Sequence, residues 1–333
     1  MASAARYRKA RAATKARSVM AAEIRAGLLA DPPAIPSKYF YDDEGSRLFE
    51  EITRLPEYYQ TRTEERILEA RADEVVARFR PRELVELGSG ASRKTRVLLD
   101  AMARSGRLRR CVLFDINERF LQESLRSLAA AYPGLEPRGV AGDFATDLAA
   151  IGISRQRRLA VFLGGTVGNL LPSEVPAFLA RLASVLARGD GFLLGVDLVK
   201  DPARLHAAYN DAAGVTARFN RNILRVVNEA LDGDFDPAAF EHVAFYDEAR
   251  AWIEMRLRAL RPMRVHLREA GVERTFEAGD EIRTEISCKY TRASVQALLP
   301  GTGLRMVDWL TDGEELFALA VLERLATLPA AAG

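Results

Sequence analysis

Between Glu83 and Asp197, short apolar runs alternate with segments whose apolar residues recur every three or four positions. The short runs have the length of buried strands, whereas the longer segments have the period of helices that cover a sheet. This alternation is typical of a parallel sheet with helices on both faces. We predict strands at ELVELG, CVLFDI, EPRGVAGD, LAVFLG and GFLLGVDL, and helices over Arg93–Arg104, Glu118–Ala131 and Ser173–Arg188, with Ser92, Asn117 and Ser173 as their N-caps.

The pattern changes after Asp197. A long helical stretch, Pro202–Leu231, is followed by polar strand-like segments such as AWIEMRLRAL and MRVHLREA, which indicate a second, antiparallel domain. Near the end of the chain, LRMVDWLTD and ELFALAVLER return to strand character and can form a hairpin that completes the first sheet. We therefore predict an α/β protein with an inserted α+β domain. Its expected parts are a basic segment at 1–19, the α+β domain at 20–62 and 198–288, and the sheet domain at 63–197 and 289–325.

The composition mainly restricts the partners. The 48 Lys and Arg residues nearly balance the 46 Asp and Glu residues, and the net charge of +2 is too small to indicate a surface for nucleic acid or membranes. No apolar stretch approaches the roughly 20 residues of a membrane helix, and residues 1–19 lack the apolar part of a secretory signal. We expect a cytoplasmic monomer with a small-molecule partner, and we assign no function to the basic segment.

The cysteines and histidines give no sign of a metal site. Cys111 and Cys288 lie far apart in strand-like segments, and they fit buried thiols better than a disulfide or a metal pair. His206, His242 and His266 are the only histidines, and none has the spacing of metal ligands. We therefore predict no bound metal.

Three consecutive strand ends carry residues that suit a nucleoside. The first strand runs into Gly88-Ser89-Gly90, a turn that lets a ligand approach the backbone. Asp115 ends the next strand, where an acidic side chain commonly accepts hydrogen bonds from ribose hydroxyls. At the end of the third strand, Asp143 could accept from an adenine amino group while Phe144 lies against the ring. Ligands of open α/β sheets bind outside the carboxyl ends of the strands, so we expect these residues to converge there.

Two cofactor classes fit these strand ends, nicotinamide dinucleotides and S-adenosylmethionine. Asp115 and Asp143 could instead be no more than helix caps, but caps alone do not explain the glycine turn. The third glycine of a dinucleotide fingerprint is absent. Glu86, just before the turn, would repel a diphosphate but could orient a cationic sulfonium. The residues therefore favour S-adenosylmethionine and a methyl transfer.

Several long segments resemble one known enzyme family. They are FYDDEGSRLFEEITRLPEYYQTRTEERIL, LVELGSGASRKT, FLGGTVGNL, GVDLVKD, FNRNIL and EIRTEISCKY. In these segments the chain resembles the histidine Nα-methyltransferases of ergothioneine biosynthesis, over about residues 36 to 324. The resemblance implies a Rossmann-like class I methyltransferase sheet that binds S-adenosylmethionine, and a second domain that binds substrate. It also implies transfer of three methyl groups to the α-amino group of free L-histidine, which gives hercynine.

The same resemblance implies the residues of the site. Glu285 and Ser287, two apart in a strand-like segment, would bind the two polar ends of the imidazole, and Met255 would form an apolar wall. Such a site rejects analogues without those ends by about 10⁴-fold or more. The other implied residues are Asn169 and Tyr41 at the substrate amino group, Tyr58 and Tyr209 at its carboxylate, Gly164 elsewhere on the substrate, and Gly88, Lys94, Asp115, Asp143 and Phe144 at the cofactor.

Alternatives stay open for some residues and for the function. Tyr59 and Tyr39 stand close to the two assigned tyrosines of the N-terminal motif, and Glu285 could be a surface residue that pairs with Arg283 and Lys289. A methyltransferase for another free amino acid, such as tryptophan, would share the fold and cofactor. A noncatalytic nucleoside-binding or regulatory protein and, more distantly, a nicotinamide oxidoreductase belong to other classes.

Overall fold

The computed structural model describes residues 17–88 and 93–326. The glycine turn beyond Gly88, the predicted cap Ser92 and most of the basic segment lie outside the described residues. The chain separates into two compact units, which we call the insert unit and the sheet unit. The insert unit consists of Met1–Ile52, Tyr209–Tyr246 and Ile253–Ile286, and the sheet unit of Thr53–Ala208, Asp247–Trp252 and Ser287–Gly333.

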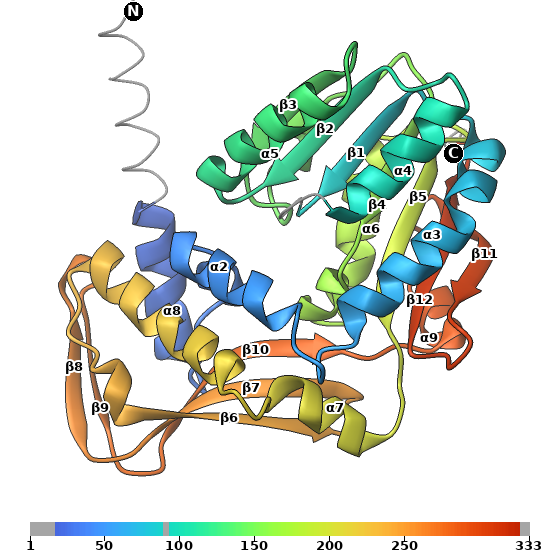
Figure 1. The fold of residues 1–333 in the computed structure, drawn as a ribbon. Helices are drawn as coiled ribbons and strands as arrows, with labels where there is room; N and C mark the ends of the chain where they lie inside the picture. Colours follow the sequence, from blue (N-terminus) through green and yellow to red (C-terminus); the bar gives the residue numbers. More distant parts are fainter. Residues whose placement is uncertain (1–16, 89–92, 327–333) are drawn as a thin grey trace, which may run out of the picture. The chain divides into compact units, whose positions relative to one another are not determined.

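The sheet unit is built on a seven-stranded sheet (Figure 1). The first five strands in the sequence pair in parallel. The two C-terminal strands form an antiparallel hairpin, and the last of them pairs antiparallel with the strand Gly191–Asp197. The prediction of a mostly parallel sheet completed by a C-terminal hairpin is therefore confirmed. The strands lie in the order β11 (Leu304–Thr311), β12 (Phe317–Arg324), β5 (Gly191–Asp197), β4 (Arg158–Phe162), β1 (Glu83–Leu87), β2 (Arg110–Asp115) and β3 (Glu136–Ala141).

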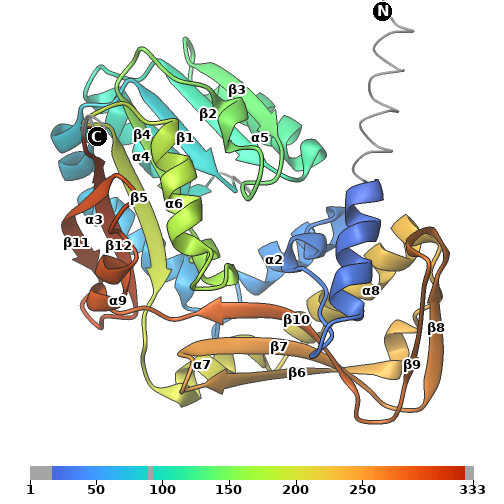
Figure 2. The same cartoon turned by 180° about the vertical axis from the view of Figure 1, so that it is seen from behind.

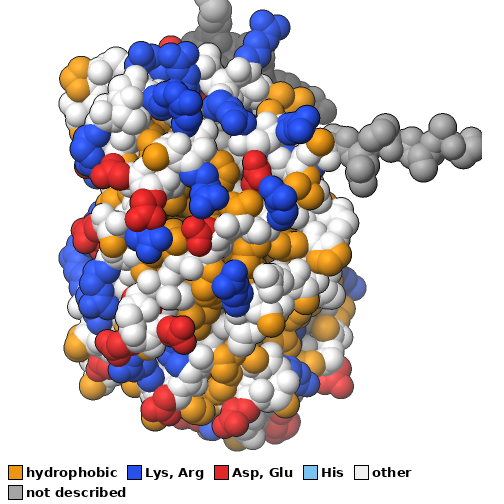
Figure 3. Space-filling view, turned by 90° about the vertical axis from the view of Figure 1, so that its right-hand side faces the viewer, with side chains coloured by type: hydrophobic (Ala, Val, Ile, Leu, Met, Phe, Trp, Pro, Cys, Tyr) orange, Lys and Arg blue, Asp and Glu red, His pale blue; other side chains and the backbone are white. Residues whose placement is uncertain are grey.

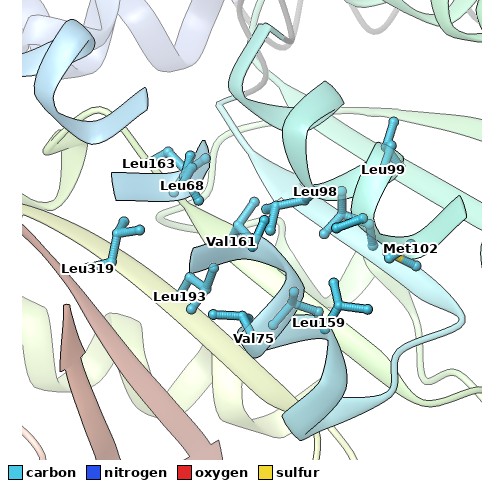
Figure 4. Packing of buried hydrophobic residues seen from close by; sticks show 14 of the residues in the cluster. Leu68, Val75, Leu98, Leu99, Met102, Leu159, Val161, Leu163, Leu193 and Leu319 are labelled. Carbon is cyan, nitrogen blue, oxygen red and sulfur yellow. The ribbon is translucent and has the colours of Figure 1, made fainter. Parts of the chain in front are cut away.

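Helices pack on both faces of this sheet. Three of them, α3 (Gln60–Phe79), α4 (Arg93–Arg104) and α5 (Glu118–Ala131), share a core cluster with the strands on one face. The fourth, α6 (Val175–Ser184), covers the other face (Figures 1 and 2). Each fully buried aliphatic side chain contributes roughly 1.5–3 kcal/mol by its burial. Figure 4 shows the core on the first face, where Leu68, Leu98, Leu159, Leu193 and Leu319 gather from helices and strands.

Two of the predicted helix starts can be checked against the structure. Asn117 is confirmed as the N-cap of α5, because its side-chain oxygen accepts from the Phe120 N–H at 3.1 Å. Ser173 is wrong as the cap of α6, which begins at Val175 after Glu174. The Glu174 carboxylate accepts from the Leu171 N–H at 3.0 Å and closes a turn there, so the helix begins beyond that turn.

The prediction of one long helix over Pro202–Leu231 is also wrong. The segment forms two helices, α7 (Pro202–Tyr209) and α8 (Val215–Leu231). Asp211 fixes the start of the second helix, because its carboxylate accepts from the N–H groups of Val215 and Thr216 at 2.8 Å each. Gly214 completes the break with a φ of +68°, which favours glycine. An acidic residue and a glycine within four positions were visible in the sequence as turn signals.

The insert unit combines helices with two small antiparallel sheets. Residues 17–28 are helical, and α8 packs against η1 (Ser37–Phe40), where the Phe40 and Phe219 rings stack at 4.5 Å. One sheet has the order β10 (Glu281–Cys288), β7 (Trp252–Ala259), β6 (Phe240–Asp247), and the other pairs β8 (Met263–Leu267) with β9 (Val272–Phe276). The other elements of the insert unit are α2 (Asp43–Ile52), η4 (Pro237–Ala239) and η5 (Arg268–Ala270), and those of the sheet unit are η2 (Leu148–Ile151), η3 (Thr166–Asn169) and α9 (Arg292–Ala297).

Charged side chains of both signs are interspersed on the face drawn in Figure 3, with apolar side chains between them. Several exposed pairs tie neighbouring elements together, including Arg78 with Asp308 and Arg104 with Asp73. Exposed pairs of this kind contribute little stability, about 0–1 kcal/mol each. No helix in the described part of the chain has the length and apolar character to cross a membrane.

Candidate functional site

The carboxyl ends of the parallel strands carry most of the predicted cofactor residues. Gly88 follows β1, Asp115 ends β2, and Asp143 follows β3. The Gly88 N–H donates to the Phe114 carbonyl at 2.8 Å, and the Gly142 N–H donates to the Asp115 carbonyl at 3.0 Å. The structure therefore brings the three strand ends to one edge of the sheet. Gly88 has a φ of +70°, a conformation that other residues rarely adopt.

The two aspartates each shape the turn in which they lie. Asp115 accepts from the Asn117 N–H at 2.9 Å, and Asp143 accepts from the Ala145 N–H at 2.8 Å. Neither carboxylate is the N-cap of α5, because Asn117 has that role. These bonds fix each aspartate in the turn that follows its strand.

Phe144 is held by other aromatic rings. Its ring packs edge-on against Phe162 of β4 at 5.2 Å and against Phe178 of α6 at 5.9 Å. Edge-to-face pairs at such distances are favourable, so these two contacts fix the orientation of the Phe144 ring.

Glu86 is a buried acid beneath the cofactor residues. Burial raises the pKa of its carboxyl to about 8, although the Thr95 hydroxyl and the charge of Lys94 favour the ionised form. The charges of Asp115 and Glu64 act in the same direction as burial. Without a cofactor, the folded chain therefore holds Glu86 protonated at neutral pH.

The buried acid predicts a pH-dependent stability. Between the unfolded pKa of about 4.3 and the folded pKa of about 8, the folded chain binds a proton that the unfolded chain has lost. The stabilisation from this proton is complete below the unfolded pKa and is lost as pH rises through 8. Glu86→Gln should remove the dependence, so from pH 6.5 to 8.5 the native protein should lose on the order of 1–2 kcal/mol more than the variant. Urea unfolding of both proteins without cofactor measures this, and parallel pH profiles would contradict it.

Lys94 and Gly164 both bind the carboxylate of Glu64, which was not predicted from the sequence as part of the site. Glu64 of α3 is fully buried, and the Lys94 ammonium forms an ion pair with it. The Gly164 N–H donates to both Glu64 oxygens, at 3.0 and 2.8 Å. A Cβ built on Gly164 would lie 3.5 Å from the Lys94 nitrogen. The structure thus places a predicted cofactor residue beside a predicted substrate residue, and Glu64 fixes both.

Asn169 and Ser287 lie on segments that pack closely within the sheet unit. Asn169 ends η3, and Gly168 before it has no side chain where η3 meets the end of β10. A Cβ on Gly168 would lie 2.9 Å from the Cys288 carbonyl oxygen and 3.5 Å from the Ser287 hydroxyl oxygen. Gly168 therefore allows the loop that carries Asn169 to approach the segment that carries Ser287.

The neighbouring tyrosines differ in what holds their hydroxyls. Tyr59 donates to the Asp197 carboxylate at 2.9 Å and accepts from the Lys200 ammonium at 2.7 Å, in a buried network. Tyr58 is buried beside it, with 8% of its surface exposed. Tyr39 donates to Glu23. These partners give Tyr59 and Tyr39 roles in the fold.

Four predicted substrate residues lie in the insert unit on separate elements. Tyr41 packs edge-on against the rings of Phe49 and Phe219, at 5.8 and 5.9 Å. Tyr209 is buried at the end of α7, and Met255 is buried on β7. The fourth, Glu285, is half-buried on β10, two positions before Ser287. Residues two apart on a strand share a face, which agrees with a joint role for the two.

A buried polar chain fixes the backbone around these residues. Nε2 of His242 lies 2.9 Å from the Tyr209 carbonyl oxygen, and its Nδ1 lies 2.8 Å from the Asn220 amide nitrogen. The Thr284 hydroxyl donates to the Asn220 oxygen at 2.6 Å, and its oxygen also lies 3.2 Å from the Met255 carbonyl. Burial lowers the pKa of His242, so a neutral ring donates from Nε2 and accepts at Nδ1. No local sequence pattern marked this network.

The residues at the strand ends fit a nucleoside cofactor such as S-adenosylmethionine, because aspartates at the positions of Asp115 and Asp143 can accept hydrogen bonds from ribose hydroxyls and an adenine amino group. The repulsion of a diphosphate that was expected from Glu86 does not arise while its carboxyl is protonated. When bound, the cofactor supplies an electrophilic methyl group. Within residues 17–88 and 93–326, no group of three or more His, Cys, Asp or Glu side chains could hold a metal ion.

The comparisons with known proteins identify the family. The family model described as histidine-specific methyltransferase, SAM-dependent, matches residues 20–324. The chain belongs to this family. Membership confirms the resemblance found in the sequence motifs, and it makes the chain an S-adenosylmethionine-dependent methyltransferase.

Individual relatives agree with the family. Histidine N-alpha-methyltransferase from Mycolicibacterium smegmatis is 49% identical over 313 residues, which cover 94% of this chain and 97% of the relative. The protein of the same name from Mycobacterium tuberculosis is 48% identical over 299 residues, covering 90% and 93%. Ergothioneine biosynthesis protein 1 from Neurospora crassa is 31% identical over 303 residues, which cover 85% of this chain and 32% of that protein.

Proposed function

We propose that the protein transfers methyl groups from S-adenosylmethionine to the α-amino group of free L-histidine. Three transfers would give hercynine, and this reaction would be the first step of ergothioneine biosynthesis. The observation that carries the proposal is the match of the histidine-specific family model over residues 20–324. The 49% identity to a histidine N-alpha-methyltransferase over nearly the whole of both chains supports it. We further propose a cytoplasmic monomer that combines a cofactor-binding sheet domain with an inserted substrate-binding domain.

The protein selects histidine through its contacts with the imidazole ring. Glu285 accepts a hydrogen bond from one ring N–H, and the Ser287 hydroxyl meets the other nitrogen. The buried side chain of Met255 provides an apolar contact for the ring. An amino acid without the two polar ring positions would leave Glu285 and Ser287 without substrate partners, which is a strong basis for rejection.

The amino acid end of histidine is assigned to amide and phenol groups. Asn169 and Tyr41 position the amino group, Tyr58 and Tyr209 bind the carboxylate, and Gly164 contributes on the substrate side. The amine must be neutral to react, and the reference pKa of an α-amino group is about 7.7–8.0. Alignment of the nitrogen with the methyl carbon and the sulfur supplies much of the catalysis, so a strong base is not required.

The cofactor is assigned to the strand ends of the sheet unit. Asp115 accepts from the ribose hydroxyls, Asp143 accepts from the adenine amino group, and Phe144 lies against the adenine ring. Gly88 lets the cofactor approach the backbone. The Lys94 ammonium contacts the cofactor carboxylate, and its ion pair with the buried Glu64 supports this by holding the ammonium in place.

The proposal is tested by the mass of the product. Purified protein is incubated with S-adenosylmethionine and each standard amino acid in turn, and gains of one, two and three methyl groups are followed. We expect trimethylation of histidine alone, with at least 10⁴-fold preference over tryptophan. Methylation of another amino acid would retain the reaction class and overturn the assignment of Glu285 and Ser287. Cofactor binding without any methylation would instead support a noncatalytic binding protein.

A further inference from the structure

A buried lysine stands directly behind the proposed imidazole residue Ser287. Lys289 lies just past the end of β10, and its side chain is 0% exposed. Its ammonium donates to the Ser287 hydroxyl oxygen at 2.8 Å and pairs with the Asp197 carboxylate at 3.0 Å. Ser287, Lys289 and Asp197 all belong to the sheet unit. An ammonium this deeply buried is costly unless it is paired and hydrogen-bonded, so its position requires a reason.

The direction of the hydrogen bond follows from the chemistry of the two groups. An ammonium has three donors and no acceptor, whereas a serine hydroxyl has one donor and two acceptor lone pairs. The Ser287 oxygen must therefore accept from Lys289. The positive charge beside the oxygen also favours the orientation in which the hydroxyl hydrogen turns away from the lysine. Ser287 is thus prepared to donate to a group on its far side.

The network around Asp197 holds Lys289 in place. Asp197 ends β5, and it also accepts from Tyr59 at 2.9 Å and from Lys200 at 2.5 Å. Burial alone would raise the pKa of Asp197, but the charges of Lys289 and Lys200 outweigh it and hold that pKa below its ordinary value. The carboxylate is therefore ionised, and it anchors both lysines. Only Lys289 is hydrogen-bonded to Ser287 among the contacts described for these two lysines.

We propose that Lys289 is a positioning residue, which orients the Ser287 hydroxyl so that it donates to the unprotonated ring nitrogen of histidine. The inference rests on the proposed function, in which Ser287 meets the imidazole. It adds the polarity of that contact: Ser287 donates, while Glu285 accepts from the ring N–H. One neutral tautomer of the ring satisfies both residues at once.

A double-mutant cycle distinguishes this role from a purely structural one. The affinity for histidine is measured by calorimetry on the full chain saturated with S-adenosylhomocysteine, for native protein, Ser287→Ala, Lys289→Met and the double variant. We expect each single substitution to weaken histidine binding roughly 10-fold. The double variant should be no weaker than Ser287→Ala alone, because Lys289 acts through the hydroxyl. The affinity for S-adenosylhomocysteine should change less than 2-fold in all variants.

The outcomes separate the inference from the proposed function. If Ser287→Ala binds histidine as tightly as the native protein, the placement of Ser287 at the imidazole fails, and the inference fails with it. If Ser287→Ala is weakened but Lys289→Met is not, only the inference is overturned. The inference is also overturned if Lys289→Met weakens histidine binding by the same factor in the native protein and in Ser287→Ala. The effect of the lysine would then not depend on the Ser287 hydroxyl.

Two further variants control for the loss of a buried charge. Lys200→Met removes the other lysine from Asp197, and we expect it to lower the melting temperature while histidine affinity stays within about 2-fold, since Lys200 has no described contact with Ser287. A loss of histidine affinity equal to that of Lys289→Met would count against the inference. If Lys289→Met does not fold, Lys289→Gln takes its place in the double-mutant cycle, because glutamine removes the charge but keeps a polar side chain. The same criteria then apply.

Discussion

Replacing Glu83 with alanine is expected to lower the free energy of unfolding by about 3–5 kcal/mol. The side chains of Glu83 and Arg158 are 1% and 2% exposed, and Nε of Arg158 donates to the Glu83 carboxylate at 2.6 Å. The two residues face each other across the parallel pair of β1 and β4. Without the carboxylate, a buried guanidinium keeps the carbonyls of Gly152 and Val185 as partners but loses its anion. Urea unfolding followed by circular dichroism measures the loss.

Glu136→Ala is the matched control. Glu136 pairs with Arg110, which also contacts Glu83, but its side chain is 70% exposed. We expect a loss of about 0–1 kcal/mol, as for other surface pairs. Both glutamates lie at the amino-terminal edge of the sheet, away from the strand ends that carry the cofactor residues, so neither substitution should change the affinity of the folded protein for S-adenosylhomocysteine. A small loss of about 0–1 kcal/mol of unfolding free energy in both variants would contradict the prediction, because the buried pair would then contribute no more stability than the exposed one.

The sheet could be predicted from the sequence because its strands are buried on both faces. All five residues of β1 and of β4 are buried, and so are all seven of β5, and these strands read as mostly apolar runs with charged residues near their ends. The break between α7 and α8 was missed because the apolar period continues across it. There the hydrogen bonds of Asp211 decide the structure, and periodicity does not register them. Local capping chemistry is thus a stronger signal than period at a helix boundary.

The placement of the proposed cofactor residues was easier to predict than the contacts that support the site. Gly88, Asp115 and Asp143 stand at the ends of strands, and the topology of a parallel sheet brings such positions to one edge. The supporting contacts join residues that lie far apart in the chain, such as Glu64 with Gly164 and Asp197 with Tyr59. No spacing rule predicts these pairs.

Lys289 shows the same limit most clearly. The alternation of charges along its segment allowed it to be a surface partner of Glu285, yet it is fully buried beside Asp197. Its ammonium pairs with Asp197 at the end of β5, a segment far from it in the sequence, and also donates to Ser287 two positions before it. A charged residue in a strand can therefore be assigned to the surface or to a buried network only when the opposite segment is known.

Replacing Glu285 with alanine is expected to lower kcat/KM for histidine by roughly 10- to 100-fold, because the substitution would remove the carboxylate that we propose as the acceptor for the imidazole N–H. The proposed cofactor residues Gly88, Asp115 and Asp143 lie at the ends of other strands, so the affinity for S-adenosylhomocysteine should stay unchanged. Steady-state kinetics with histidine, together with calorimetry for S-adenosylhomocysteine, measures both quantities. Unchanged kinetics for histidine would show that Glu285 does not select the substrate.

The preference among amino acids tests the selector more sharply than the loss of rate. If Glu285 rejects other side chains because they leave its carboxylate unpaired, alanine at this position should reduce the ratio of kcat/KM for histidine to that for tryptophan. Glu277→Ala, an exposed glutamate in the turn before β10, should leave the ratio as it is. A fall in both rates by the same factor would mean that Glu285 supports the fold or the methyl transfer in general. A fall confined to histidine would mean that its carboxylate recognises the imidazole, because only that substrate offers it a ring N–H in the assigned position.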